Sequence, residues 1–201
     1  MTQQRGTDRR VHETRTQLHD ALASLVHEKP YDEIVVKEIV ARAAVGRSTF
    51  YAHYRDKDEL LDRGIRDLLR LDAQPRQRWT CATERILRFS LPFLEHVERY
   101  REHGVLPMDA SGAAAIHDRL RRVLEDALAL ELQAEMGRRP RHAPIDSIPP
   151  GLLARHVAGT FVLALGWWLE HPTRSARDVD AWFRALVEPV LWKVLGGSAT
   201  A

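Results

Sequence analysis

Cysteine is almost missing from this chain of 201 residues. Cys81 is the single cysteine, so an internal disulfide is impossible and no cysteine cluster has the spacing of a zinc site. His96 and His103 lie seven residues apart without a cysteine or a tight carboxylate cluster nearby, so we interpret them as solvated side chains and predict no metal and no cofactor. A chain without disulfides suits the reducing cytoplasm.

Long hydrophobic runs are missing as well. The first ten residues are polar and lack the apolar centre of a signal peptide. The most apolar run, residues 157–169, is short for a membrane span and contains Gly159 and Gly166, so it favours a buried helix and predicts no membrane contact. With 44% apolar and 29% charged residues and scattered glycine and proline, the chain is neither disordered nor fibrous.

The chain also lacks a strong excess of either charge. Its formal net charge is +2, which is too small to indicate a nucleic-acid partner. The placement of basic residues is more informative, because a phosphate backbone responds to local potential. Between positions 36 and 57 only Glu38 and Asp56 are acidic, whereas the basic residues are Lys37, Arg42, Arg47, Arg55 and Lys57. Arginines also crowd the N-terminus, at positions 5, 9, 10 and 15.

Apolar residues recur three and four positions apart in the first 72 residues, which predicts an N-terminal helical domain. Helices are expected over residues 8–28, ending near Pro30, and over 34–43 and 47–54. Asp56 is expected to cap a fourth helix. Short helices joined by a tight turn predict a helix-turn-helix.

The helical period of about 100° per residue assigns a direction to each side chain of segment 47–54. Phe50 and Tyr54 fall together and are predicted to close a small core with Ile39, Val40, Ala43 and Val45. Ser48 points away from that core, and Thr49 and Tyr51 lie on its shoulders. The exposed face is polar and narrow enough for the major groove of DNA, which admits one α-helix.

Residues 47–61, RSTFYAHYRDKDELL, closely resemble the recognition helix and following helix of TetR-type transcriptional regulators, and the resemblance extends over roughly residues 8–70. It implies a regulator that binds a palindromic DNA operator as a homodimer and is released by an unknown small-molecule effector. A repressor is expected, with an activator or a ligand-independent regulator as the alternative. No metal signature, nucleophile elbow or phosphate loop indicates an enzyme.

Seven residues are predicted to contact DNA: Lys37, Arg47, Ser48, Thr49, Tyr51, His53 and Lys57. Arg47 has the planar fork for two hydrogen bonds to guanine O6 and N7, although a surface arginine is also compatible with a solvated charge. Ser48 and Thr49 begin the helix, where hydroxyl and backbone N–H groups suit a phosphate oxygen. Tyr51 is expected to donate to phosphate with its ring near a thymine methyl, and the alternative is a partly buried packing role.

The other three predicted contacts are less defined. His53 either contacts the DNA backbone or braces the turn, and the sequence favours neither. The resemblance places Lys57, in the first turn of the next helix, near a phosphate. Lys37 can reach either a base or a phosphate from the preceding helix.

Three positions depart from the family pattern. Val35 stands where members usually have Thr or Ser, so a helix cap and a phosphate contact are expected to be lost. Ala44 occupies a turn position that is commonly Gly, where a left-handed conformation costs about 1 kcal/mol. Gly46 replaces the Ser that commonly precedes the arginine, and Gly is a weaker cap.

Residues 73–201 are predicted to form a second, all-helical domain for ligand binding and dimerisation. Helices are expected over residues 80–102, interrupted near Pro92, and over 112–135, 151–171 and 175–195, with 137–150 as an exposed loop. Aromatic and apolar residues of this domain are suited to a ligand pocket or to an ordinary helical core: Trp79, Phe89, Phe93, Tyr100, Met108, Phe161 and Trp168. For each of them singly, core packing is the preferred interpretation.

The last helix has one wide apolar stripe, and small residues in its neighbour allow close approach. Two such helices from each of two subunits would form a four-helix interface. The alternative is that the stripe is simply the intramolecular core. The resemblance favours the dimer, and the interface residues are predicted to be Ala158, Gly159, Val179, Trp182, Phe183, Leu186, Val190, Leu191 and Val194.

Overall fold

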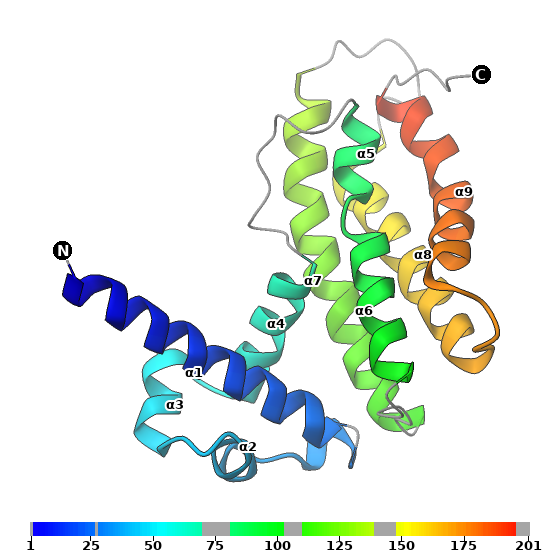
Figure 1. The fold of residues 1–201 in the computed structure, drawn as a ribbon. Coiled ribbons are helices and arrows are strands. Elements are labelled where there is room, and N and C mark those ends of the chain that lie inside the picture. Colours follow the sequence, from blue (N-terminus) through cyan, green and yellow to red (C-terminus); the bar gives the residue numbers. More distant parts are fainter. Residues whose placement is uncertain (1, 27, 70–80, 103–109, 139–147, 196–201) are drawn as a thin grey trace. The chain divides into compact units, whose positions relative to one another are not determined.

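The computed structural model describes residues 2–26, 28–69, 81–102, 110–138 and 148–195 (Figure 1). Side chains are described from residue 11 on, apart from residues 100, 102 and 110–113. Every regular element in these ranges is a helix, which confirms the all-α prediction: α1 Thr2–Val26, η1 Tyr31–Glu33, α2 Val36–Arg42, α3 Arg47–His53, α4 Lys57–Leu68, α5 Ala82–Leu87, α6 Ser90–Glu102, α7 Ala110–Met136, α8 Pro150–Glu170 and α9 Ala176–Leu195.

The chain divides into two compact units. The first contains Met1–Ile65 together with Gly104–Ile116, and the second contains Arg66–His103 and His117–Ala201. The division therefore falls within α4 and α7, and the domain boundary expected at residue 72 lies outside the described residues. Each unit has its own hydrophobic core.

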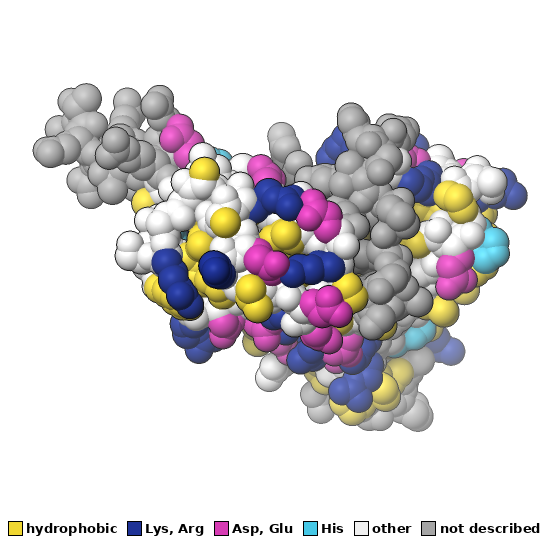
Figure 2. Space-filling model, turned by 90° about the horizontal axis from the view of Figure 1, so that it is seen from below, with side chains coloured by type: hydrophobic (Ala, Val, Ile, Leu, Met, Phe, Trp, Pro, Cys, Tyr) yellow, Lys and Arg dark blue, Asp and Glu magenta, His cyan; other side chains and the backbone are white. Residues whose placement is uncertain are grey.

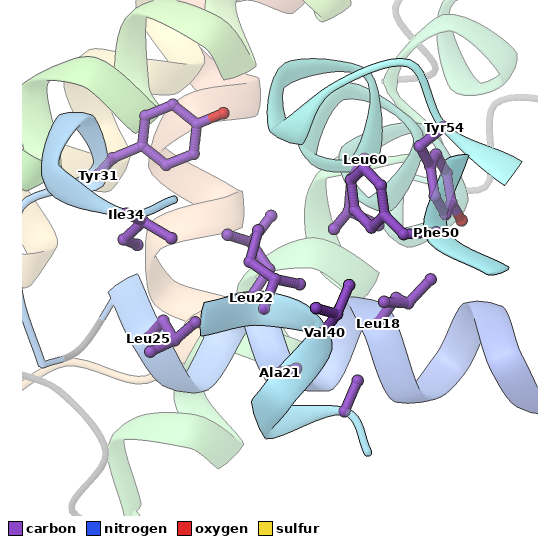
Figure 3. Packing of buried hydrophobic residues seen from close by; sticks show 12 residues of the cluster. Leu18, Ala21, Leu22, Leu25, Tyr31, Ile34, Val40, Phe50, Tyr54 and Leu60 are labelled. Atoms are coloured by element: carbon purple, nitrogen blue, oxygen red, sulfur yellow. The ribbon is translucent and has the colours of Figure 1, made fainter. Parts of the chain in front are cut away.

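The first unit is organised around α1, which lies across α2 and α3 (Figure 1). Leu18, Leu22 and Leu25 recur on one side of α1 and are almost completely buried, as expected for the apolar face of an amphipathic helix. Figure 3 shows these side chains pointing toward residues of the later helices, including Val40, Phe50 and Leu60. This contact holds α2 and α3 against a common support.

The predicted small core behind segment 47–54 is confirmed. Phe50 is fully buried, Tyr54 is 2% exposed, and their ring centroids lie 5.9 Å apart (Figure 3). The hydroxyl of Tyr54 also lies 3.1 Å from Nε2 of His19 on α1. Ile39, Val40 and Ala43 are buried with them, and Val45 packs against the cluster. The opposite face of α3 is therefore held outward.

The turn between α2 and α3 contains a strained residue. Ala44 has φ = 53°, the left-handed region predicted for this position. The N–H of Ala44 donates to the carbonyl of Ala41 at 3.3 Å, and the N–H of Val45 donates to that of Val40 at 3.1 Å. These two bonds form a Schellman motif, whose left-handed residue is most often Gly.

Ala44→Gly is expected to raise the free energy of unfolding by about 1 kcal/mol, because Gly adopts this φ without the steric cost that Ala bears. Urea denaturation measures the change. Ala52→Gly, an exposed position inside α3, is the matched control and is expected to lower stability by about 0.5 to 1 kcal/mol. Equal losses at both positions would show that the turn does not strain Ala44.

In the second unit, α9 packs against α5, α6 and α8. The interruption expected near Pro92 is found just before it, at residues 88–89, and Pro92 lies in the first turn of α6, where its missing N–H is not needed. The other helices start and end within two residues of the predicted ones. Residues 139–147 of the predicted loop lie outside the described ranges.

Within the described residues, α8 is long and apolar enough, by length and composition, to cross a membrane. The sequence interpretation was a buried helix. One side of α8 agrees with it, because seven of its residues are buried in the core of the second unit: Leu153, Ala154, Val157, Ala158, Phe161, Leu165 and Trp168.

Candidate nucleic-acid interface

The outward face of α3 carries the residues expected at DNA. Arg47, Ser48 and Tyr51 are exposed, whereas Thr49 and His53 are half-buried. Gly46 occupies the position before the helix and provides no side-chain cap. Figure 2 looks at the side of the molecule on which α2 and α3 lie, where basic and acidic side chains are interspersed.

Arg47 and Tyr51 are brought together on this face. The guanidinium carbon of Arg47 lies 6.0 Å from the centre of the Tyr51 ring, at the outer limit of a cation–π contact. Tyr51 is 50% exposed, and its ring edge packs on Phe50 with centroids 5.4 Å apart. The buried Phe50 therefore supports the Tyr51 ring, which in turn lies beside the Arg47 head group.

The basic residues between positions 36 and 57 are not equally available. Arg42 makes two 2.8 Å hydrogen bonds to the carboxylate of Glu28, and Arg55 pairs with Glu59 at 3.2 Å. Within the described part of the chain, neither Lys37 nor Arg47 forms an ion pair, and both are exposed. The local positive potential expected from five basic residues is therefore concentrated on two of them.

Ion pairing also lowers the pKa values of three carboxyl groups. Hydrogen bonds from Arg42 lower the pKa of Glu28, those from Lys29 lower that of Glu38, and the backbone N–H of Arg55 lowers that of Glu59. A lowered folded-state pKa stabilises the fold above the unfolded pKa, and this contribution is lost as the pH falls through the folded value. Because Glu28 is exposed and Glu38 and Glu59 are only half-buried, solvent screens the effect.

The entry into α2 confirms the expected loss of a cap. Val35 occupies the N-cap position, has no side-chain acceptor, and is 53% exposed. The carboxylate of Glu38 accepts the backbone N–H of Val35 at 3.1 Å, so half of a capping box remains. Lys29 holds that carboxylate at 2.6 Å.

Val35→Thr is expected to raise the free energy of unfolding by about 1 kcal/mol, because a hydroxyl at the N-cap can accept a backbone N–H of the first turn of α2, from Lys37 or Glu38. Urea denaturation of the full chain is the measurement. Val35→Ala supplies no acceptor and serves as the matched control without a gain. An unchanged or lower stability of the Thr variant would contradict the geometry of this helix start.

Lys57 is placed differently from the other predicted contacts. Its ammonium group donates to the carbonyl oxygens of Tyr31 and Ile34, each at 2.8 Å, and to that of Asp32 at 3.1 Å. A phosphate oxygen would have to replace one of these carbonyls, so the phosphate contact implied by the resemblance stays a prediction. The sequence contained no signal for these contacts, because the partners lie more than twenty positions away.

His53 lies half-buried at the end of α3, and its ring centroid is 6.3 Å from that of Tyr54. This position is compatible with both interpretations of His53, the brace and the contact with the DNA backbone.

The residues suggested for a ligand pocket are only partly described. Trp79, Met108 and the side chain of Tyr100 lie outside the described residues. Phe89, Phe93 and Phe161 are buried and pack edge to face, with Phe161 centred 5.0 Å from Phe89 and 5.5 Å from Phe93. Trp168 is fully buried and its indole N–H donates to the carbonyl of Arg174 at 2.8 Å. These contacts agree with the preferred interpretation of core packing.

The predicted dimer stripe needs a correction. The structure buries five of its members inside the second unit, so they are not available to a partner: Ala158, Val179, Phe183, Leu191 and Val194. The helix α9 is apolar on more than one side because it packs against several helices. Trp182 and Leu186 are exposed, and Gly159 and Val190 are half-buried.

Exposed apolar residues of α8 were missed by the sequence interpretation. Leu152, Leu163 and Trp167 are 59%, 70% and 45% exposed. The ring of Trp167 lies 5.7 Å from that of Trp182, in an edge-to-face arrangement that joins the two helices. The spacing of four between Leu163 and Trp167 was a detectable signal of a second helix face. We call the set of Leu152, Gly159, Leu163, Trp167, Trp182 and Leu186 the α8–α9 face.

Comparisons with known proteins bear on the N-terminal domain and on the fold of the chain. Residues 18–63 match the family model of bacterial regulatory proteins of the tetR family, whereas no curated protein sequence gave a significant match. The chain is similar to the crystal structure of a TetR transcriptional regulator from Streptococcus agalactiae, with 23% identity and a TM-score of 0.54 over 90% of this chain and 97% of the other. It is also similar to a TetR-family transcriptional regulator from Syntrophomonas wolfei, with 13% identity and a TM-score of 0.58 over 94% and 99%. The N-terminal domain of the chain therefore belongs to the tetR family of bacterial regulatory proteins, and the chain has the fold of the TetR-type transcriptional regulators to which it is similar.

Proposed function

We propose that the protein is a repressor that binds a palindromic DNA operator as a homodimer and is released by a small-molecule effector. The observation that carries the DNA contact is the outward face of α3, where Arg47 has no ion-pair partner among the described residues and lies beside the ring of Tyr51. A bacterial regulator of this kind acts in the cytoplasm.

In the proposed complex α3 enters the major groove. Arg47 donates two hydrogen bonds to guanine O6 and N7, and Tyr51 contacts a phosphate and a thymine methyl. Ser48, Thr49 and Lys37 contact the backbone and set the register. His53, the last residue of α3, contacts the DNA backbone in this proposal.

The α8–α9 face supports the proposed homodimer. Single exposed apolar residues are ordinary on a protein surface, but this face gathers several on two adjacent helices, two of them tryptophans. A two-fold axis would place the same residues of both subunits against one another. Burial on this second side would also account for the membrane-like apolarity of α8.

Effector release is the family's usual behaviour, and we propose it for the second unit of this chain. An effector lowers DNA affinity only by the difference in its own affinity for the two states of the dimer. A coupling of about 1 to 3 kcal/mol corresponds to a change of roughly 5- to 150-fold. A screen of small apolar compounds for release of bound operator tests this step, and release by none would favour a ligand-independent regulator.

Selection of bound sequences from random duplex DNA tests the proposed DNA binding. We expect enrichment of a two-fold symmetric sequence whose half-sites lie about one helical turn apart, because a symmetric dimer presents two copies of α3. Enrichment of a single asymmetric half-site would contradict binding as a dimer. The absence of any enriched sequence would contradict sequence recognition by the outward face of α3.

A further inference from the structure

The ammonium group of Lys57 occupies a site built from the chain itself. Its three carbonyl partners, in Tyr31, Asp32 and Ile34, use all the donors that a lysine ammonium has. The nitrogen also lies 4.6 Å from the centre of the Tyr31 ring, within the range of a cation–π contact. In the described structure, groups of the chain itself therefore bind the charge of Lys57.

The segment that Lys57 holds leads directly into α2. Residues 31–33 form the short helix η1, and Val35 is the N-cap of α2. The remaining carbonyl of the segment, in Glu33, accepts from Lys29 at 3.3 Å. Four successive carbonyl oxygens therefore accept hydrogen bonds from two lysines, in addition to the backbone bonds from Glu33 to Pro30 and from Ile34 to Tyr31.

A second contact from the same turn of α4 fastens this segment. Tyr31 is 4% exposed, and its hydroxyl donates to Oδ1 of Asp58 at 2.5 Å. Lys57 and Asp58 are adjacent in the sequence, so the start of α4 makes hydrogen bonds both to backbone carbonyls of this segment and to the side chain of Tyr31. These contacts bind the segment that leads into Val35, the N-cap of α2.

We propose that Lys57 is a positioning residue for DNA binding, which fixes the start of α2 from inside the fold and does not neutralise a phosphate. This inference rests on the proposed function. α2 packs against α3 and carries Lys37, so a displaced start of α2 alters how Lys37 and the outward face of α3 fit against DNA. The expected effect is a loss of affinity that leaves the number of phosphate contacts unchanged.

The dependence of operator affinity on salt separates the two roles. Each phosphate contact contributes about 0.9 to the slope of log affinity against log salt concentration. We expect Lys57→Gln to weaken operator binding about tenfold without changing this slope, because hydrogen bonds to a charged group are lost. Lys37→Gln removes an exposed lysine of α2 and is expected to lower the slope by about 0.9 for each half-site.

Lys57→Arg provides a second discrimination that keeps the charge. A phosphate contact tolerates Arg, whereas a planar guanidinium cannot direct its donors at three converging carbonyls. We therefore expect Lys57→Arg to bind as weakly as Lys57→Gln. Full binding by the Arg variant, a lower slope in the Gln variant, or unchanged affinity in both would overturn the proposal.

Hydrogen exchange of the free protein keeps this test separate from the proposed function. In Lys57→Gln the backbone amides of Ile34 and Glu38 are expected to exchange faster than in the wild type, because their bonds to Tyr31 and Val35 depend on the held segment. Unchanged exchange at these amides would overturn the positioning role. Failure of the wild-type protein to bind any selected duplex would instead reject the proposed function and with it the role of Lys57 in DNA binding, whereas faster exchange in Lys57→Gln would still show that Lys57 fixes the start of α2.

Discussion

Arg47→Ala is expected to weaken operator binding by about 5- to 150-fold for each half-site, with no change in oligomeric state. A bidentate arginine–guanine pair is worth about 1 to 3 kcal/mol of discrimination, and each 1.4 kcal/mol is tenfold in affinity. Arg47 is exposed on α3, and no described residue forms an ion pair with it, so its removal leaves the fold intact. Titration of the selected duplex by fluorescence anisotropy measures the loss.

Arg177→Ala is the matched control for Arg47→Ala. Arg177 is an arginine of α9 with an 82% exposed side chain, and its removal deletes the same charge from the second unit. We expect its operator affinity to stay within about twofold of the wild type, since a surface substitution away from a site changes little. Equal losses in both variants would assign the effect to total charge and would reject base reading by Arg47.

Leu186→Glu is expected to dissociate the homodimer. Leu186 is 59% exposed on the α8–α9 face, so the substitution leaves the core of the subunit unchanged. A two-fold interface would bury the new carboxylate twice, and an uncompensated buried charge costs about 3 to 5 kcal/mol. The dimer dissociation constant should rise by at least about a hundredfold in sedimentation equilibrium.

Leu130→Glu provides the control for this substitution. Leu130 lies on α7, is 70% exposed, and does not belong to the α8–α9 face. Its variant is expected to remain dimeric and to bind the operator. A monomeric Leu130→Glu protein together with a dimeric Leu186→Glu protein would place the interface on another surface.

The sequence predicted those features of the helix-turn-helix that depend on local periodicity. A separation of four residues places Phe50 and Tyr54 on one side of a helix whatever the rest of the fold, and both are buried. The left-handed Ala44 and the missing cap at Val35 were predicted from the resemblance to the family pattern, which marks the turn and cap positions of this segment.

Contacts between distant segments were not predictable in this way. Arg42 is as basic in sequence as Lys37, but the fold brings Glu28 to it and leaves Lys37 exposed without an ion pair among the described residues. Lys57 matched a family pattern, whereas its observed partners come from a segment more than twenty residues earlier. Such pairings depend on how helices pack, which periodicity does not specify.

The dimer stripe shows the same limit for apolar residues. Phe183 and Leu186 both belong to the apolar pattern of α9, but Phe183 is fully buried and Leu186 is exposed. A helix that packs on several neighbours needs apolar residues around much of its circumference, so the pattern alone does not separate core from surface.

Methylation interference on the selected duplex tests the central claim, that the Arg47 face of α3 reads base edges in the major groove. Methylation of guanine N7 adds a methyl group in that groove at the atom that Arg47 is proposed to contact. We predict that methylation at two symmetry-related guanines blocks binding of the wild-type protein and has little effect on the residual binding of Arg47→Ala. Binding by the wild type that no guanine methylation impairs would contradict the account.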